Sequence, residues 1–276
     1  MKLFKKVAII GTGLIGGSLG LAIKKHGLAG RVVGVSRHKQ SLVLAKGKGA
    51  IDQGSLSLDI VKGADLLVLS AGVDTIISLA KRISTLVKKN CIVIDVASSK
   101  EKIVSSLERI FPNFVGTHPL AGSEKRGIAN ASLTLFKDSL CIVTPTKKTQ
   151  ETALRKVKTM WNKINVKTVS LSPKEHDQAL AFTSHLPHAV AFSLINSIPN
   201  KNFKFASGGL KDVTRIAASD SRIWLEIIFS NRKNILKAIK SFKVELNKIE
   251  SAIQRKDKAS LLKVLKSAKS KRENLG

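Results

Sequence analysis

The 276-residue sequence contains no tyrosine, few other aromatic residues and few acidic residues. Only 19 aspartate and glutamate residues oppose 48 lysine and arginine residues, so the formal net charge is +29. With 4% aromatic residues and no zinc-finger spacing, the chain lacks the usual features of nucleic-acid-binding proteins. We therefore interpret the charge first as a lysine-rich solvated surface, second as a field that attracts an anionic substrate, and only third as nucleic-acid binding.

Cysteine and long apolar runs are also scarce. The two cysteines, Cys91 and Cys141, stand inside apolar runs, where a thiol behaves as a small buried hydrophobe, and no disulfide framework is expected. No run reaches the length of a membrane helix, and the first apolar stretch ends at Gly11, too early for a signal peptide. The sequence therefore predicts a cytoplasmic protein without a membrane partner, and no pattern in it indicates a metal site.

Short β-branched runs alternate with amphipathic helical stretches over the first 171 residues. The predicted strands are residues 7–10, 31–35, 64–70, 91–96, 113–117, 139–144 and 166–171. This alternation predicts an α/β fold of the Rossmann type, a doubly wound parallel sheet with helices on both faces.

The pattern changes at Ser172. Residues 172–175 read Ser-Pro-Lys-Glu, a capping box with proline at the first helical position, and only helical patterns follow. We therefore predict two domains, over residues 1–171 and 172–276, of which the second is all-helical. Its long apolar faces need covering, and a homodimer through this domain is favoured somewhat over packing against the first domain.

A glycine motif follows the first predicted strand and opens the first predicted helix. Gly11 permits a tight turn, Gly13 lets the backbone approach a pyrophosphate, and Gly16 allows close packing of helix on strand. The helix N-terminus then faces the phosphates, so the first domain is predicted to bind a dinucleotide. The residues expected to contact it here are Gly11, Thr12, Gly13, Leu14, Ile15 and Gly16.

The second predicted strand ends without the acidic residue that binds the ribose 2′-hydroxyl of NAD. Ser36, Arg37 and His38 follow instead, and a hydroxyl beside cations suits the 2′-phosphate of NADP. The alternative is that these are ordinary loop cations of a lysine-rich protein. We predict that the three residues contact the cofactor and that NADP is preferred, with NAD as the second choice.

The six histidines can be sorted by their positions. His26 lies near the end of the first helix, His38 in the cofactor loop and His176 directly after the capping box, and none of these positions calls for catalysis. His118 lies just past predicted strand 113–117, and open parallel sheets bind ligands at the carboxyl ends of their strands. From the residues alone, a catalytic and a structural role for His118 stay equally open.

Other polar residues occupy comparable positions. Ser98 follows the predicted strand 91–96 and has a hydroxyl that can orient an imidazole. His185 and His188 share a helix face, and Pro187 between them should kink that helix. Arg215 is a fixed charge suited to a carboxylate. Each is compatible with a structural role by itself, but together with the cofactor loop they indicate one site at a cleft between the domains.

Five stretches of the sequence resemble the prephenate dehydrogenase family, which includes arogenate dehydrogenases. They are IIGTGLIGGSLG, DVASSK, GTHPLAGSEKRG, EHDQALAFTSHLPHAVA and GGLKDVTRIAASDSRIW, which span essentially the whole chain in the family's order. The resemblance implies oxidative decarboxylation. Hydride leaves the hydroxyl-bearing ring carbon for the nicotinamide, and the ring carboxylate departs as carbon dioxide.

The resemblance also implies roles for single residues. His118 matches the catalytic histidine that accepts the ring hydroxyl proton, and Ser98 matches the serine that positions it. Arg215 matches the arginine that binds a substrate carboxylate. The substrate-binding residues that follow from the resemblance are His185, His188, Lys211, Arg215 and Trp224, the last either lining the site or packing beneath it.

Two positions depart from the family pattern. Leu210-Lys211-Asp212 replaces Phe-Arg-Asp, which keeps a positive charge but loses the planar guanidinium. Ala97-Ser98 replaces Gly-Ser, so the backbone there is less free. We expect both changes to affect rate or substrate preference and not to abolish activity.

Three hypotheses for function follow. The first is an NADP-preferring prephenate dehydrogenase of tyrosine biosynthesis; arogenate is the alternative substrate, and no residue decides between the two. The second is a basic protein that binds nucleic acid or a membrane surface on a nucleotide fold, motivated by the charge alone. The third is a dehydrogenase of a small hydroxy acid that uses Lys100 as its base.

Overall fold

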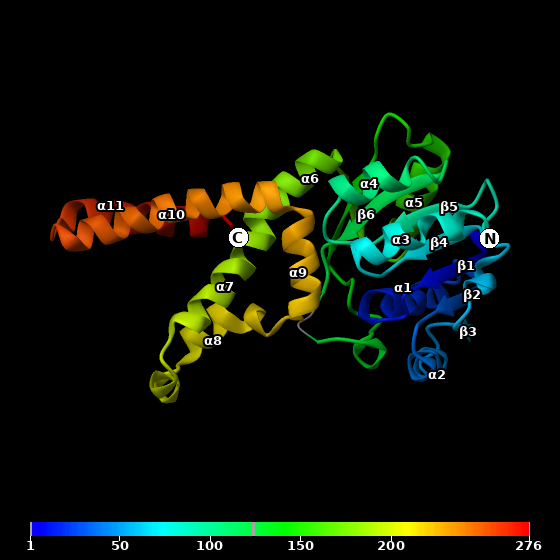
Figure 1. Cartoon of the computed structure of the whole chain (residues 1–276), viewed down its shortest axis with the longest axis horizontal. Coiled ribbons are helices and arrows are strands. Elements are labelled where there is room, and N and C mark those ends of the chain that lie inside the picture. The colour runs from blue at the N-terminus through cyan, green and yellow to red at the C-terminus, as the bar shows by residue number, and fades with distance from the viewer. Residues whose placement is uncertain (1, 123–124, 276) are drawn as a thin grey trace.

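The first part of the chain is built on one eight-stranded sheet, in the order β3-β2-β1-β4-β5-β6-β7-β8 (Figure 1). The computed structural model describes residues 2–122 and 125–275, so two residues of the stretch 116–127 lie outside it. The strands are β1 (Phe4–Ile10), β2 (Ala29–Val35), β3 (Gln53–Ser55), β4 (Leu66–Leu69), β5 (Ile92–Asp95), β6 (Phe114–Pro119), β7 (Leu140–Thr144) and β8 (Lys167–Ser170). The order reverses between β1 and β4, the switch point at which open α/β sheets bind ligands.

Two strands depart from the predicted parallel sheet. Strands β1 to β6 are parallel, but β7 pairs antiparallel with β6, and β8 pairs parallel with β7. The described residues between β6 and β7 hold the 3₁₀ turn Ile128–Asn130 and no crossover helix, which a parallel return would need. The prediction was therefore wrong for the direction of these two strands. The three-residue strand β3 was also not predicted, because it is too short for an alternating pattern.

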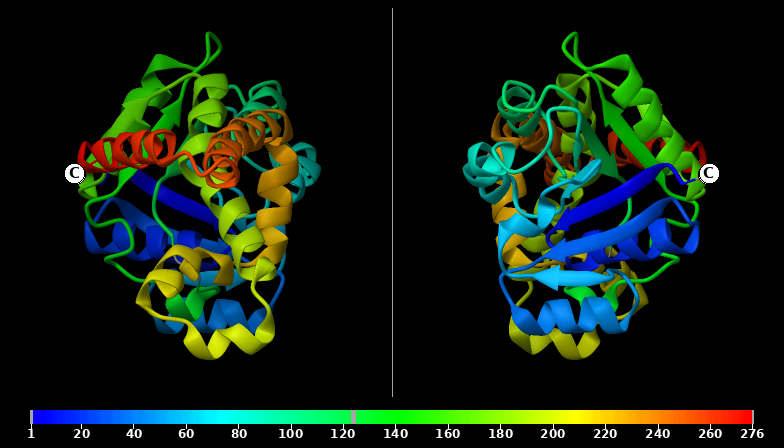
Figure 2. Two further views of the ribbon diagram at one scale, coloured as in Figure 1. Left: turned by 90° about the vertical axis from the view of Figure 1, so that its left-hand side faces the viewer. Right: turned by 90° about the vertical axis from the view of Figure 1, so that its right-hand side faces the viewer.

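Helices cover both faces of the sheet, as the alternation predicts (Figure 2). They are α1 (Leu14–Lys25), α2 (Lys39–Gly47), α3 (Val73–Ser84), α4 (Glu101–Leu107) and α5 (Glu151–Lys163). Buried residues of α1, α2 and α5 join one apolar cluster, and those of α3 and α4 join a second cluster on the other face. Each cluster contains every second residue of the central strands, which is why those strands read as continuous apolar runs.

Only helical elements follow β8 in the described chain. They include α6 (Pro173–Leu180), a π-helical turn (Ala181–His185), α7 (Leu186–Ser197), α8 (Gly208–Thr214), α9 (Ser221–Ser230), α10 (Arg232–Gln254) and α11 (Lys258–Glu273). The capping box is present: the Ser172 hydroxyl accepts a hydrogen bond from the Glu175 amide, and the Glu175 carboxylate accepts one from the Ser172 amide. These bonds fix the point at which the chain leaves the sheet and enters the helices.

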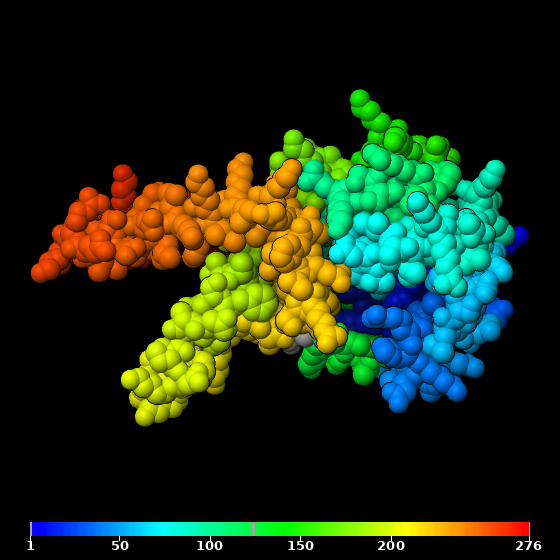
Figure 3. Space-filling view, viewed as in Figure 1, coloured from blue at the N-terminus to red at the C-terminus, as the bar shows by residue number. Residues whose placement is uncertain are grey.

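The helical part has one side against the sheet and one side that projects from it. Helix α9 lies beside α3, and an ion pair between Arg126 and Asp220 joins the segment after β6 to the start of α9. Helices α10 and α11 pack together as an arm that extends away from the sheet, and α7 and α8 form a second projection (Figures 1 and 3). No helix among the described residues is long and apolar enough to cross a membrane.

Candidate active site

The glycine motif lies at the switch point, between β1 and α1. Gly11 has a φ of +96°, and a Cβ at this residue would overlap the carbonyl oxygen of Ser70. A Cβ at Gly16 would overlap the carbonyl oxygen of Gly11. By contrast, a Cβ at Gly13 would meet no atom within 4 Å, so this residue borders open space. Gly11 and Gly16 therefore serve the fold of the loop, while Gly13 leaves room for a ligand.

The start of α1 suits the pyrophosphate of a dinucleotide. The first turn of this helix, which the structure describes completely, holds no acidic residue, and its N-cap is Gly13. The amides of Leu14, Ile15 and Gly16 thus face a position with no competing carboxylate from their own helix. The Thr12 hydroxyl is buried and has no hydrogen-bond partner among the described residues. These groups fit an anionic ligand at the place where the motif predicts one.

The loop after β2 carries the residues predicted to select the cofactor. Arg37 and His38 are exposed, and Ser36 is half-buried, with its hydroxyl accepting a hydrogen bond from the His38 amide. The first turn of α2, also fully described, holds no acidic residue. The loop therefore presents an arginine, a histidine and a hydroxyl next to the switch point.

His118 lies on β6 and is buried, with 8% of its surface exposed. Its Nδ1 lies 2.8 Å from Nε2 of His176, and Nδ1 of His176 lies 2.8 Å from a carboxylate oxygen of Asp177. Both partners come from α6, so a strand of the sheet and the first helix after it meet here. The sequence interpretation passed over His176, because the contact spans 58 residues and the available signal was only an adjacent His-Asp pair.

The surroundings of these histidines keep the rings neutral. Burial lowers the pKa of His118 well below 6.5, and electrostatic interactions with His176, Lys100 and His185 act in the same direction. Burial, with Lys100 and His185 nearby, lowers the pKa of His176 to about 2. A neutral imidazole is the form that can accept a proton, so the site favours base chemistry at His118.

Lys100 does not act as the base that the hydroxy-acid hypothesis requires. Its side chain is completely buried, and its ammonium group forms an ion pair with Asp95, which is also completely buried. The Asp95 carboxylate accepts a further hydrogen bond from the Ala97 amide. Breaking such a pair would leave an uncompensated buried charge. Lys100 therefore contributes a fixed positive charge behind the histidines.

Ser98 is half-buried at the end of β5, and the described residues include no hydrogen-bond partner for its hydroxyl. No hydrogen bond joins this hydroxyl to the His118 ring among the described residues; Nδ1 of that ring is paired with His176 instead. The Ser98 backbone lies near the ring of His185. Ser98 is thus beside the histidines, with its hydroxyl available to a ligand.

His185 and His188 lie on one face of the helix, as predicted, and both contact Trp224. The His188 ring stacks on Trp224 with centroids 3.6 Å apart, and the His185 ring meets it edge-on at 6.0 Å. The expected kink at Pro187 takes the form of the π-helical turn that ends at His185.

A second missed residue, Asn231, connects His185 to α6. Its amide nitrogen donates hydrogen bonds to the Asp177 carbonyl oxygen at 2.7 Å and to Nδ1 of His185 at 3.1 Å. His185 must therefore carry its proton on Nε2, and that atom is buried without a partner among the described residues. Burial lowers the pKa of His185 to about 4. The Ser98 backbone acts against that lowering as an acceptor facing the ring N–H.

Arg215 and Lys211 lie at the rim of this arrangement. Arg215 begins the 3₁₀ turn Arg215–Ala218, and its charge helps to lower the pKa of His188, after burial as the main cause. Lys211 is exposed on α8, one helical turn earlier. The structure thus brings a cation close to His188, while no described contact joins Lys211 to the histidines.

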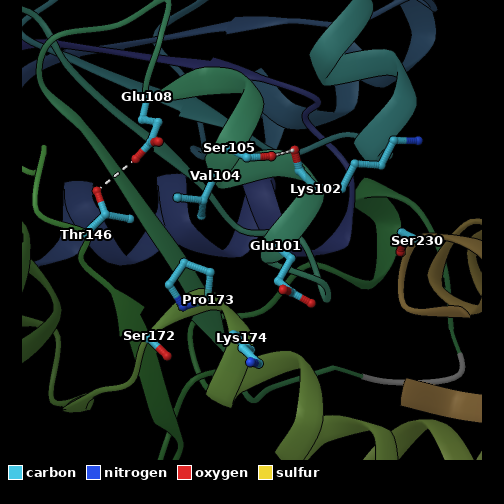
Figure 4. A pocket seen from close by; sticks show the side chains of 10 residues that line it. All are labelled: Glu101, Lys102, Val104, Ser105, Glu108, Thr146, Ser172, Pro173, Lys174 and Ser230. Atoms are coloured by element: carbon cyan, nitrogen blue, oxygen red, sulfur yellow. Dashed lines mark hydrogen bonds between the residues drawn. The ribbon is translucent and has the colours of Figure 1, made fainter. Parts of the chain in front are cut away.

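A surface hollow of about 610 Å³ lies between α4 and the start of α6 (Figure 4). Its lining residues are Glu101, Lys102, Val104, Ser105, Glu108, Thr146, Ser172, Pro173, Lys174 and Ser230. None of the histidines or glycines described above lines it. We therefore place the chemistry at the histidines and not in this hollow.

Comparisons with known proteins agree with this geometry. Residues 19–170 match the family model described as prephenate dehydrogenase, nucleotide-binding domain, and residues 172–267 match prephenate dehydrogenase, dimerization domain. Prephenate dehydrogenase of Bacillus subtilis is 34% identical over 98% of this chain and 76% of its own length. Cyclohexadienyl dehydrogenase of Zymomonas mobilis is 32% identical over 99% of this chain and 96% of its own length.

Solved structures give the same result. Prephenate dehydrogenase from Aquifex aeolicus, in complex with hydroxyphenyl propionate and NAD+, has a TM-score of 0.93 and 36% identity and covers 99% of this chain and 98% of that one. Arogenate dehydrogenase from Synechocystis has a TM-score of 0.84 and 25% identity, covering 98% of this chain and 100% of that one. The chain belongs to the prephenate dehydrogenase family and is a dehydrogenase that uses a nicotinamide cofactor.

Proposed function

We propose that this chain is a cytoplasmic prephenate dehydrogenase, which converts prephenate to 4-hydroxyphenylpyruvate in tyrosine biosynthesis. The observation that carries the proposal is the buried, neutral His118 on β6, in the same sheet that carries the glycine motif after β1. The nicotinamide, when bound, accepts the electron pair of the ring C–H bond. His118 takes the proton of the ring hydroxyl, and the bond to the ring carboxylate breaks, which makes the ring aromatic. The proton then returns from His118 to the product oxygen, so protons and electrons balance.

The remaining site residues would bind and orient the substrate. Arg215 provides a guanidinium for a substrate carboxylate, and Nε2 of His185 provides a buried donor. His188 and Trp224 form a stacked wall that limits the movement of the ring. We assign Ser98 to the hydroxyl that His118 deprotonates, and Lys211 to the rim as a second positive charge for a dianionic substrate. Together, these residues suit a small molecule with two carboxylates.

Substrate and cofactor are tested together by crossing prephenate and arogenate with NAD and NADP and following reduced nicotinamide by its absorbance. We expect reduction with prephenate and NADP at the highest kcat/KM. Turnover of arogenate alone would replace the proposed substrate with the alternative. An absence of reduction in all four mixtures, from a folded protein that binds NADP, would contradict the proposed function.

We further propose that Ser36, Arg37 and His38 make the enzyme prefer NADP. The Arg37→Gln variant should raise the KM for NADP by about 10- to 100-fold, the equivalent of one charge-assisted hydrogen bond, and leave the KM for NAD within about 2-fold. Arg109→Gln removes another arginine of the same domain, distant from the cofactor loop, and should change neither constant. Equal effects of Arg37→Gln on both cofactors would contradict the assignment.

We also propose that the enzyme is a homodimer through its helical part. Leu225 and Phe229 on α9 are 59% and 67% exposed, and other large apolar side chains are exposed on α10 and α11. Sedimentation should give twice the chain mass. Leu225→Lys with Phe229→Glu should give the monomer, whereas Leu56→Lys, at an equally exposed leucine of the sheet domain, should leave the dimer intact. A wild-type monomer at micromolar concentration would contradict the proposal.

A further inference from the structure

The Asp177 carboxylate occupies a fixed position behind the histidines. It is 1% exposed, and its two oxygens accept hydrogen bonds from the amides of Lys100 at 2.7 Å and Glu101 at 2.9 Å. Backbone amides can only donate, so both carboxylate oxygens are acceptors in this arrangement. The carboxylate is therefore held at the start of α4 by groups that no side-chain substitution removes.

The position of the carboxylate determines where the proton of His176 lies. Nδ1 of His176 is 2.8 Å from the oxygen that also accepts from Lys100. An accepting carboxylate oxygen requires the hydrogen on Nδ1, and in a neutral imidazole Nε2 then carries a lone pair. His176 is completely buried in this structure, so no water competes for that lone pair.

The same reasoning passes from His176 to His118. Nε2 of His176 lies 2.8 Å from Nδ1 of His118. Because Nε2 of His176 carries a lone pair, Nδ1 of His118 must be the donor in this hydrogen bond. The second ring nitrogen of His118, Nε2, is then left without a hydrogen and has no partner among the described residues. An imidazole in this form is a base before substrate arrives, because its free nitrogen already has the lone pair.

We propose that His176 and Asp177 are positioning residues that hold His118 in the Nδ1–H form, so that its Nε2 is always ready to accept the substrate proton. The tautomer assignment stands on the hydrogen bonds alone, and its consequence for turnover rests on the proposed function. Neither residue touches the reacting atoms. The arrangement is a relay in which a carboxylate orients one imidazole and that imidazole orients the next.

The opposite order of protons is the alternative that a test must distinguish. It would need a proton on Asp177, donated to Nδ1 of His176, and a hydrogen on Nε2 of His118. Burial raises the pKa of Asp177, while the amides of Glu101 and Lys100 and the charge of Lys100 oppose that rise. The two orders differ in which nitrogen of each ring bears hydrogen, and this difference can be measured directly.

Histidine-selective ¹⁵N NMR of the resting enzyme reads the tautomers without turnover. Six histidines give a simple spectrum, and His118→Asn and His176→Gln assign the two signals. We expect both His118 and His176 in the Nδ1–H form. A hydrogen on Nε2 of His118 in the wild-type enzyme would overturn the proposal. Because no substrate is present, this result does not depend on whether the proposed function is correct.

Asp177→Asn tests the relay through kinetics. The asparagine amide keeps one acceptor oxygen for the two backbone amides, and when its NH₂ group takes the Lys100 side it faces Nδ1 of His176, reverses both tautomers and places a hydrogen on Nε2 of His118. We expect kcat to fall by roughly 10²–10⁴-fold, with KM and NADP affinity within about 3-fold. Asp52→Asn is the matched control, since Asp52 also accepts a backbone amide bond but lies far from the histidines. A kcat within a few-fold of wild type together with a hydrogen on Nε2 of His118, or a lowered kcat with an unchanged His118 tautomer, would overturn the proposal.

A pair of variants at His176 guards against simple damage to the fold. Glutamine places an acceptor near the position of Nε2 and can still receive the His118 hydrogen, whereas asparagine is too short to do so. We expect His176→Gln to retain at least 10-fold more kcat than His176→Asn, which corresponds to about 1.4 kcal/mol. Equal losses in the two variants would show a structural role and contradict the relay.

Discussion

His118→Asn is expected to lower kcat by roughly 10²–10⁴-fold while NADP binds as tightly as to the wild-type enzyme. Asparagine cannot accept the hydroxyl proton, so the base is lost, but its amide is close in position to Nδ1 and can still donate to His176. The dinucleotide contacts that we propose come from the glycine loop and the start of α1, which this change does not touch. Single-turnover absorbance and a fluorescence titration with NADP measure the two quantities separately.

His26→Asn is the control for this experiment, because His26 is exposed at the end of α1. It should leave both turnover and cofactor affinity unchanged. If His118→Asn retained more than about a tenth of the wild-type kcat, His118 would not be the base, since general base catalysis contributes 10²-fold or more. A loss of NADP affinity in the same variant would instead indicate that the substitution had damaged the fold of the sheet around β6.

Gly13→Val should abolish cofactor binding without harming the fold. Gly13 has a φ of −84°, which any residue adopts, and its Cβ position is open, so the valine side chain fits the protein without a ligand. It would then occupy the space that the pyrophosphate needs. We expect NADP affinity to fall by at least 100-fold, equivalent to about 2.7 kcal/mol, with an unchanged Tm.

Gly47→Val is the matched control, because Gly47 also has open space around its Cβ position but lies at the end of α2, away from the cofactor loop. It should bind NADP normally. Full NADP affinity in Gly13→Val would mean that the dinucleotide takes a path other than the one that the motif predicts. Loss of the folded state in Gly13→Val alone would mean that the residue serves packing and not ligand approach.

Local chemistry made much of the fold predictable. The glycine motif needs only a strand, a turn and a helix in sequence, and the capping box needs four consecutive residues. The direction of β7 was not predictable in this way, because it depends on how a segment without a crossover helix returns to the sheet. Strand patterns report burial and not direction.

Residues whose partners are distant in sequence were the ones that the sequence interpretation missed. His176 reads as an ordinary helix-start residue until β6 is seen to place His118 beside it, and Asn231 has a common side chain at the junction of two helices. Lys100 was considered as a base because it follows a strand, yet its ion pair with Asp95 depends on burial that only packing shows. Interactions between neighbours in the chain can be predicted from sequence, whereas hydrogen bonds between elements that are distant in sequence cannot.

The ratio of carbon dioxide to reduced cofactor tests the central claim most directly. With prephenate and NADP in a closed vessel, we expect one carbon dioxide released for each nicotinamide reduced, because hydride loss and decarboxylation occur on the same ring. Reduced nicotinamide without carbon dioxide would mean oxidation of a hydroxyl group alone and would contradict an aromatising dehydrogenase at His118.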